Sequence, residues 1–387
     1  MIDGLGTGGA ERSLAEMLPR LVDAGIEPVI TCLYRRREGI AQDVLRQGVD
    51  VRYLSGTNVA TRALELRRSL VKEKPDLIHT TLYDASLVGR FASIRVGSPL
   101  LTSLVSTPYA PARLKDPNVR PVSLEAVRQI DGWTARHLST HFHAITRAVK
   151  AAAVTTLGID PGRITVIERG RESTRLGEPS PERRRRVRRA LGLSEADEVV
   201  VHVGRQEFPK GHRYLVEAVE RIASRRPRLV VLMVGRRGHV SSELDRLVSR
   251  PSHASIRWTG HRDDVPDLLA AADLFVFPSV FEGLGGAVIE AMALGLPIVA
   301  SDLDAMREVV EDGRNAVLVP PASPQAIADA VVTLLDDRGR MAEFGARSRQ
   351  IFVERFTADR SVPRMIELYR QVVRRHGEPQ VRVGASA

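Results

Sequence analysis

The chain has 387 residues, of which 43% are hydrophobic and 27% charged, and its formal net charge is +10. This apolar content can fill hydrophobic cores, which excludes intrinsic disorder as the main state. The single cysteine, Cys32, excludes a disulfide scaffold. No apolar run reaches the ~20 residues of a membrane span and the first residues lack a signal-peptide pattern, so we expect a cytoplasmic protein.

The excess of Lys and Arg favours anionic partners, such as nucleotide phosphates, polyanions or an anionic membrane surface. Aromatic residues make up only 4% of the chain. Because proteins that bind single-stranded nucleic acid stack bases on aromatic side chains, we expect no nucleic-acid partner.

Short apolar runs alternate with longer amphipathic stretches along most of the chain. Runs rich in Val and Ile are typical of strands buried on both faces of a parallel sheet. The expected strands are 29–33, 51–54, 77–79, 100–105 and 142–146, followed after a break by 198–204, 229–235, 273–277, 297–301 and 316–319. The helical patterns between them include 10–22, 62–72, 214–224 and 287–294. This alternation predicts an α/β fold with right-handed crossovers.

The alternation is interrupted near 171–197, where turn-forming residues are followed by a run of arginines. We therefore predict two similar α/β domains over 1–178 and 181–355, and a closing helix within 356–387. The arginine run is interpreted as one solvated helix that begins the second domain. The alternative is a basic rim that faces an anionic partner.

The chain begins with a glycine-rich turn that has almost no strand in front of it. A central strand usually has ~5–6 residues, but only Met1, Ile2 and Asp3 precede the turn. We therefore expect that the first strand is truncated and that the natural reading frame extends upstream. The turn, Gly4 to Gly9, matches the G-x-G-x-x-G pattern of dinucleotide-binding proteins, so an NADP-dependent oxidoreductase is one alternative. A turn whose N–H groups approach another substrate is favoured over it.

A second motif joins a strand end to a helix start. Arg205 follows the strand at 198–204, and Lys210 lies five residues further on. Ligands of open α/β sheets bind beyond these carboxyl ends, where an Arg and a Lys can both reach one diphosphate. The alternative is a pair of ordinary surface cations.

A third motif follows the strand that ends at Phe277. Glycines turn the chain into a helix near Gly285, whose free N–H groups and dipole would face the same crevice. Glu282 precedes this helix, and Glu290 lies one to one and a half turns inside it. The two carboxylates can accept hydrogen bonds from two sets of sugar hydroxyls. An acid on an apolar helix face is costly unless it is paired, so a solvated Glu290 is the weaker alternative.

Together, G-G-A-E-R near the start, V-G-R…K-G-H, E-x7-E and G-L-P-I-V-A-S-D resemble a retaining glycosyltransferase of family 4. The resemblance covers essentially the whole chain. It implies the GT-B fold, in which two facing Rossmann-like domains are joined by a C-terminal helix that crosses back onto the first. It further implies transfer of a hexosyl-type sugar, with retention of configuration, from a nucleoside diphosphate sugar to a glycan, lipid-linked or small-molecule acceptor, as in polysaccharide biosynthesis.

The resemblance also implies a role for each motif residue, with the donor bound by the second domain and the acceptor by the first. The implied catalytic residues are Arg205 and Lys210 on the diphosphate and Glu282 on the transferred sugar. The implied donor-binding residues are Gly9, Leu284, Gly285, Gly286, Ala287 and, on the ribose, Glu290. On the acceptor side the candidates are His79, which ends the strand at 77–79, and Thr107. No metal and no other cofactor is implied.

Two stretches depart from the family pattern. The loop 104–109 lacks the histidine that many relatives have there, so a leaving diphosphate would itself take the acceptor's proton. Relatives have Asn-Gly before the linker, whereas this chain has Glu168-Arg169-Gly170-Arg171. A nucleotide-sugar epimerase and a non-catalytic sugar-nucleotide sensor remain alternatives. A peripheral contact with the inner face of an anionic membrane would bring a lipid-linked acceptor within reach.

Overall fold

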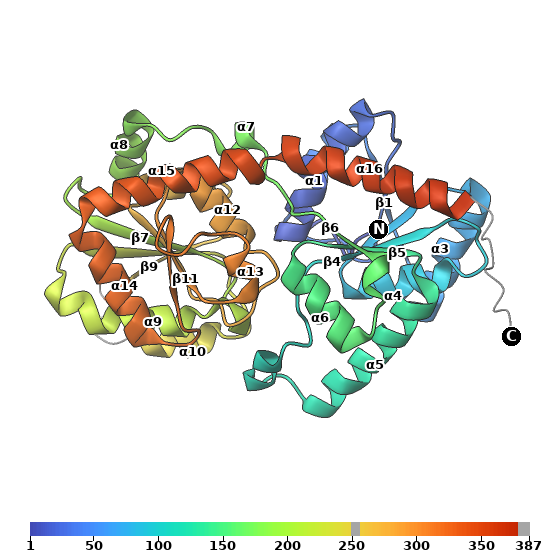
Figure 1. Cartoon of the computed structure of the whole chain (residues 1–387), viewed down its shortest axis with the longest axis horizontal. Coiled ribbons are helices and arrows are strands. Elements are labelled where there is room, and N and C mark those ends of the chain that lie inside the picture. The colour runs from blue at the N-terminus through green and yellow to red at the C-terminus, as the bar shows by residue number, and fades with distance from the viewer. Residues whose placement is uncertain (249–255, 378–387) are drawn as a thin grey trace, which may run out of the picture. The chain divides into compact units, whose positions relative to one another are not determined.

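The computed structural model describes residues 1–248 and 256–377, which form two α/β units (Figure 1). The first unit comprises 1–105, 121–169 and the chain from Asp359 onward. The second comprises 106–120 and 170–358. The predicted boundary at 178–181 thus falls inside the second unit, because the backbone of Arg171 is hydrogen-bonded there to Phe356 and Ala358.

The second unit is built on one six-stranded parallel sheet with the strand order β12-β11-β10-β7-β8-β9. Its strands are β7 (Glu198–Val203), β8 (Leu229–Val234), β9 (Ile256–Gly260), β10 (Leu274–Phe277), β11 (Ile298–Ser301) and β12 (Ala316–Val319). The chain lays down β7, β8 and β9 in one direction and then returns to β10 on the other side of β7. The strand order therefore reverses between β7 and β10, and ligands of such sheets bind beyond the carboxyl ends at this point.

Helices surround this sheet and bury both of its faces, with every residue of β8, β10 and β11 buried. They are α7 (Ser173–Leu176), α8 (Pro181–Ala190), α9 (His212–Ile222), α10 (Ser241–Val248), α11 (Val265–Ala271), α12 (Gly286–Ala293), α13 (Asp304–Arg307), α14 (Pro324–Asp336) and α15 (Arg338–Arg355). An apolar cluster of this unit packs α9 and α14 against the sheet. This core fixes the strand ends from which the site loops leave.

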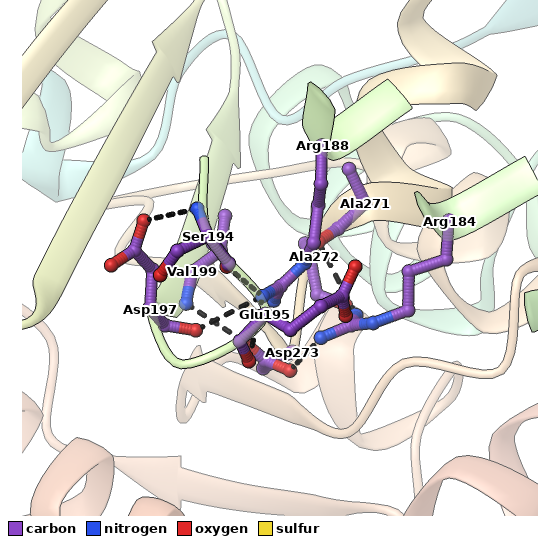
Figure 2. A network of polar contacts seen from close by, with 9 residues as sticks. All are labelled: Arg184, Arg188, Ser194, Glu195, Asp197, Val199, Ala271, Ala272 and Asp273. Atoms are coloured by element: carbon purple, nitrogen blue, oxygen red, sulfur yellow. Dashed lines mark hydrogen bonds and ion pairs between the residues drawn. The ribbon is translucent and has the colours of Figure 1, made fainter. Parts of the chain in front are cut away.

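Helix α8 contains the arginine run and is fastened to the sheet by its arginines (Figure 2). The Arg188 side chain is fully buried, donates from Nε to the Ala271 carbonyl at 3.0 Å and pairs with Asp273 at 2.7 Å. Arg184 pairs with the other oxygen of Asp273 at 2.5 Å. The prediction of a solvated helix is therefore wrong for Arg184 and Arg188, because their charges are satisfied internally.

The first unit has a parallel sheet with the order β3-β4-β5-β6 and a parallel pair β1-β2. The strands are β1 (Val29–Cys32), β2 (Asp50–Tyr53), β3 (Ile78–Thr81), β4 (Leu100–Leu104), β5 (His141–Ala144) and β6 (Ile164–Val166). Ile2 joins the two sets, since it bridges Cys32 of β1 and Thr81 of β3. The predicted first strand is thus represented by one bridging residue.

The helices of the first unit include the C-terminal one. They are α1 (Gly9–Asp23), α2 (Ala41–Arg46), α3 (Val59–Glu73), α4 (Tyr83–Ala92), α5 (Pro121–Leu138), α6 (Arg147–Leu157) and α16 (Ala358–Gly377). Helix α16 is held to this unit by the Arg364–Glu168 ion pair at 2.7 Å and by Tyr369, whose hydroxyl lies 2.7 Å from His79 Nδ1. Within residues 1–248 and 256–377, no helix is both long and apolar enough to cross a bilayer.

Candidate functional site

The candidate site lies where the loops after β7 and β10 meet, at the reversal of strand order in the second unit. The Val280 N–H donates to the Pro209 carbonyl at 2.8 Å, which ties the two loops together. Gly211 has a φ of +65°, and a Cβ there would overlap the Pro278 carbonyl. The K-G-H glycine is therefore needed both for its left-handed backbone and for the close approach of the β10 loop.

Lys210 and Glu282 come together in this loop pair. Lys210 Nζ lies 2.6 Å from Glu282 Oε2, and the two side chains are 27% and 16% exposed. The other oxygen, Glu282 Oε1, accepts a hydrogen bond from the Gly283 N–H at 3.1 Å. The predicted diphosphate cation and the predicted sugar-binding acid therefore form one charge-assisted pair rather than two separate groups.

Arg205 is exposed at the end of β7. Within the part of the chain that the structure describes, its side chain makes no hydrogen bond and no ion pair. Most other arginines of the second unit hold a carboxylate, as Arg347 does with Glu311 at 2.5 Å. Arg205 is thus a cation at the strand-order reversal whose donors are available to an anionic ligand.

The start of α12 offers further hydrogen-bond donors. Gly285 has a φ of +79°, and in the described structure no side chain caps the helix, which leaves its first N–H groups open. Leu284 is buried, and Ala287 lies in the first turn. Two buried hydroxyls at the ends of β10 and β11, Ser279 and Ser301, also lack a partner within the described residues. Unsatisfied polar groups of this kind are typical of a binding site.

Glu290 is held by two arginines that the sequence motifs did not single out. Arg171 Nε and Arg175 Nη2 each lie 3.0 Å from Glu290 Oε1. The Arg171 side chain is 3% exposed and that of Glu290 is 14% exposed. The one signal in the sequence was the departure from Asn-Gly at 168–171, where an arginine follows the glycine.

The glycine-rich turn belongs to the first unit, whereas Arg205 and Glu290 belong to the second. Gly9 is exposed and begins α1. The Glu11 carboxylate covers the turn, since a Cβ on Gly8 would meet its oxygens and one on Gly6 would lie 3.3 Å from Oε1. A carboxylate at this place repels a pyrophosphate, so the turn does not favour the NADP alternative.

His79 takes part in a buried hydrogen-bond chain within the first unit. Its Nδ1 lies 2.7 Å from the Tyr369 hydroxyl and its Nε2 lies 2.8 Å from Ser103 Oγ, which in turn lies 2.8 Å from His143 Nδ1. His143 Nε2 faces the Ile167 carbonyl at 2.8 Å and must donate to it, which fixes the direction of every bond back to Tyr369.

In this direction Tyr369 O–H donates to His79 Nδ1, and His79 Nε2–H donates to Ser103. Burial lowers the pKa of His79 well below its usual value and that of His143 to about 3, so both rings are neutral. Both nitrogens of His79 are occupied, which does not favour the predicted acceptor contact. The other acceptor candidate, Thr107, is half-buried in 106–120, a segment of the second unit.

Asp302 and His141, whose side chains are of types that can bind metals, have partners within the protein. Asp302 pairs with Arg307 at 2.5 Å. His141 Nε2 lies 2.8 Å from the Thr165 hydroxyl. Among the residues that the structure describes, no group of three or more His, Cys, Asp or Glu side chains is arranged to hold a metal ion.

Two family models match the chain, one in each half. "Glycosyl transferase 4-like domain" matches residues 8–170, and "Glycosyl transferases group 1" matches residues 197–337. The second match contains the whole loop pair described above. The first contains the glycine-rich turn and ends at the passage into the second unit.

Curated relatives extend over most of the chain. Alpha-maltose-1-phosphate synthase of Mycolicibacterium smegmatis is 28% identical, covering 82% of this chain and 85% of its own length. D-inositol 3-phosphate glycosyltransferase 2 of Catenulispora acidiphila is 30% identical, covering 87% of this chain and 84% of its own.

Two solved structures share the fold over nearly the whole chain. The crystal structure of Anabaena HepE in complex with UDP-glucose superposes with a TM-score of 0.82 at 22% identity, covering 96% of this chain and 99% of that one. Sucrose-phosphate synthase from Thermosynechococcus elongatus gives 0.83 at 20% identity, covering 97% and 96%. The two Rossmann-like units therefore have the GT-B fold, and the chain belongs to the family 4 glycosyltransferases that its motifs indicated.

Proposed function

We propose that this enzyme transfers a sugar from a nucleoside diphosphate sugar to a hydroxyl-bearing acceptor with retention of anomeric configuration. The observation that carries the proposal is the set of groups at the β7–β10 reversal. An exposed Arg205, the Lys210–Glu282 pair and the uncapped start of α12 lie on loops that are hydrogen-bonded to each other. HepE, with the same fold, was crystallised with UDP-glucose.

The chemistry of the proposed reaction explains this choice of groups. As the diphosphate leaves, negative charge develops on its oxygen, and fixed donors stabilise that charge more in the transition state than in the ground state. We assign this task to Arg205, Lys210 and the first N–H groups of α12. Glu282 and the backbone of Leu284 to Ala287 would hold the transferred sugar, and Glu290 would bind the ribose.

The proposal needs neither a metal nor a protein base. Positive charge for the diphosphate comes from side chains and from the helix start. The leaving phosphate oxygen can accept the proton of the acceptor hydroxyl, which fits a loop 104–109 without a histidine.

A donor panel tests the proposal. Binding of UDP-, GDP- and ADP-sugars, with NADP as control, is measured by calorimetry, and the bound donor is then incubated with candidate acceptors. We expect one nucleotide series to bind, NADP not to bind, and the product anomeric proton to keep the donor's configuration by NMR. An inverted product would overturn retention, and isomerisation of the sugar without an acceptor would indicate an epimerase.

We further propose that the first unit contacts anionic membranes through α5, which would give access to a lipid-linked acceptor. Val122, Ile130 and Trp133 on this helix are 84%, 49% and 52% exposed. Exposed apolar side chains with a tryptophan, on a chain of net charge +10, suit the interface of an anionic bilayer. Co-sedimentation with anionic vesicles at low salt should be lost in Ile130→Ser/Trp133→Ser, and absence of binding by the wild type would remove the idea.

A further inference from the structure

The two carboxylate oxygens of Glu290 have different surroundings. Oε1 accepts hydrogen bonds from Arg171 Nε and Arg175 Nη2, both at 3.0 Å. Oε2 has no hydrogen-bond partner in the part of the chain that the structure describes, although the side chain is only 14% exposed. One oxygen is therefore fixed by the protein and the other is left for a ligand.

Arg171 reaches Glu290 from a rigid base. Its N–H donates to the Phe356 carbonyl at 2.8 Å, and its own carbonyl accepts from the Ala358 N–H at 2.9 Å. A Cβ on the preceding Gly170 would overlap the Thr357 carbonyl. The backbone is thus pinned on both sides, and the nearly buried guanidinium has little freedom to leave the carboxylate.

The same guanidinium also lies beside Gly286, the first residue of α12. A Cβ on Gly286 would collide with Arg171 Nη2. The φ of Gly286 is in a range that any residue adopts, so its backbone does not demand glycine. The space that glycine provides is used by Arg171.

We infer that Arg171, together with Arg175, is a positioning residue for the donor that presents Glu290 Oε2 to the ribose hydroxyls. This inference rests on the proposed ribose contact of Glu290. A glutamate side chain loses rotamer freedom when a ligand orders it, and that cost is avoided when the protein has already fixed one of its oxygens. The arginines act through Glu290 and need not touch the nucleotide.

The test compares a nucleoside diphosphate of the series that binds with its 2′,3′-dideoxy counterpart. Dissociation constants are measured for wild type, Arg171→Gln and Glu290→Gln. We expect Arg171→Gln to weaken the ribonucleotide at least fivefold and the dideoxynucleotide less than twofold, because the latter has no hydroxyl for Oε2. Equal weakening of both ligands would overturn the inference while leaving the proposed function intact.

Gly286→Ala provides a second variant that leaves every charge in place. The added methyl should displace the guanidinium and reproduce the selective loss of ribonucleotide affinity. In the double variant with Arg171→Gln the two effects should not multiply, since both remove the same contact. Arg347→Gln, which breaks the ion pair with Glu311 elsewhere in the unit, is the matched control and should change neither constant.

The outcomes separate the two claims. Multiplicative losses in Gly286→Ala/Arg171→Gln would show that the two substitutions do not act through the same Arg171–Glu290 contact and would overturn the inference. A wild type that binds no nucleoside diphosphate would overturn the proposed function and this inference with it. A wild type that binds ribo- and dideoxynucleotides equally would show that Glu290 is not the ribose contact, which also removes the role of Arg171.

Discussion

At the scale of single residues, Lys210 and Glu282 show how far spacing along the chain predicts a site. Each follows a strand, β7 or β10, and neighbouring parallel strands end at the same edge of a sheet. That rule predicted that both residues face one crevice. It could not predict their 2.6 Å contact, which depends on the hydrogen bond between the two loops.

The contact between Arg171 and Glu290 cannot be predicted from spacing along the chain. It lies 119 positions from Glu290 in the sequence, and no periodicity connects them. The two residues meet because 170–171 pairs with 356–358, a contact of high sequence separation that only the folded backbone reveals. The departure from Asn-Gly drew attention to the stretch but did not indicate its partner.

We predict that the Lys210–Glu282 pair acts as one unit. Lys210→Ala and Glu282→Gln should each lower kcat/KM at least tenfold. Each substitution removes a proposed contact with the sugar nucleotide and disturbs the other side chain of the pair. The double variant should lose much less than the product of the two effects, as expected for residues in direct contact. Effects on kcat/KM that simply multiply would show that the two side chains work separately.

At the scale of elements, the sequence predicted the strands that are buried on both faces. The runs at 229–235 and 273–277 correspond to β8 and β10, in which every residue is buried. It missed β9, where only Ile256 is buried, and the three-residue β6, because neither contains an apolar run. A hydrophobic pattern therefore predicts a strand only where the side chains of that strand are buried.

The prediction of a solvated helix for the arginine run is wrong for a related reason. The charge of the run indicates exposure to solvent, but α8 packs against α11 and the start of β10. Arg188 can be buried there because Asp273 and four backbone carbonyls accept its hydrogen bonds (Figure 2). Two of the acceptor residues, Ala271 and Asp273, lie 83 and 85 positions from Arg188 in the sequence, so no local pattern links them to the helix.

We predict that two arginines three positions apart on α8 differ sharply in their effect on stability. Arg188→Ala should lower the free energy of unfolding by about 3–5 kcal/mol, because Asp273 and several carbonyls lose their donor. Arg185→Ala should change it by less than about 0.5 kcal/mol, since Arg185 is 54% exposed. Urea titration of both variants measures the two changes. Similar losses of unfolding free energy would contradict a stabilising role for the buried contacts of Arg188.

At the scale of the whole molecule, buried histidines link stability to pH. Burial holds the pKa of His141 and His202 at about 4 and that of His143 at about 3. It also holds the pKa of His79 and His212 well below the usual value. Below pH ~6.5 these histidines become protonated in the unfolded chain but stay neutral in the folded protein. The free energy of unfolding therefore falls as the pH falls.

Asp3 works in the opposite sense, because burial raises its pKa to about 6. Its contribution to stability is present in acid and is lost as the pH rises through that value. Because Asp3 is one group and the buried histidines are five, the histidines determine the net pH dependence. We therefore predict that the urea midpoint falls steadily between pH 7 and pH 5. His143→Asn should make this dependence shallower, and an unchanged slope would contradict the assignment of a neutral, buried imidazole.

The central claim is that the β7–β10 reversal of the second unit binds the diphosphate of a sugar nucleotide, and Arg205 tests it most directly. The measurement is the dissociation constant of the nucleoside diphosphate selected by the donor panel, for wild type, Arg205→Ala and Arg225→Ala. Arg225 is an exposed arginine that precedes β8, near the amino edge of the same sheet. A charge-assisted phosphate contact is worth ~1.5–3 kcal/mol, so Arg205→Ala should weaken binding at least tenfold, while Arg225→Ala should stay within twofold of wild type. Unchanged affinity in Arg205→Ala, or equal losses in both variants, would contradict the account.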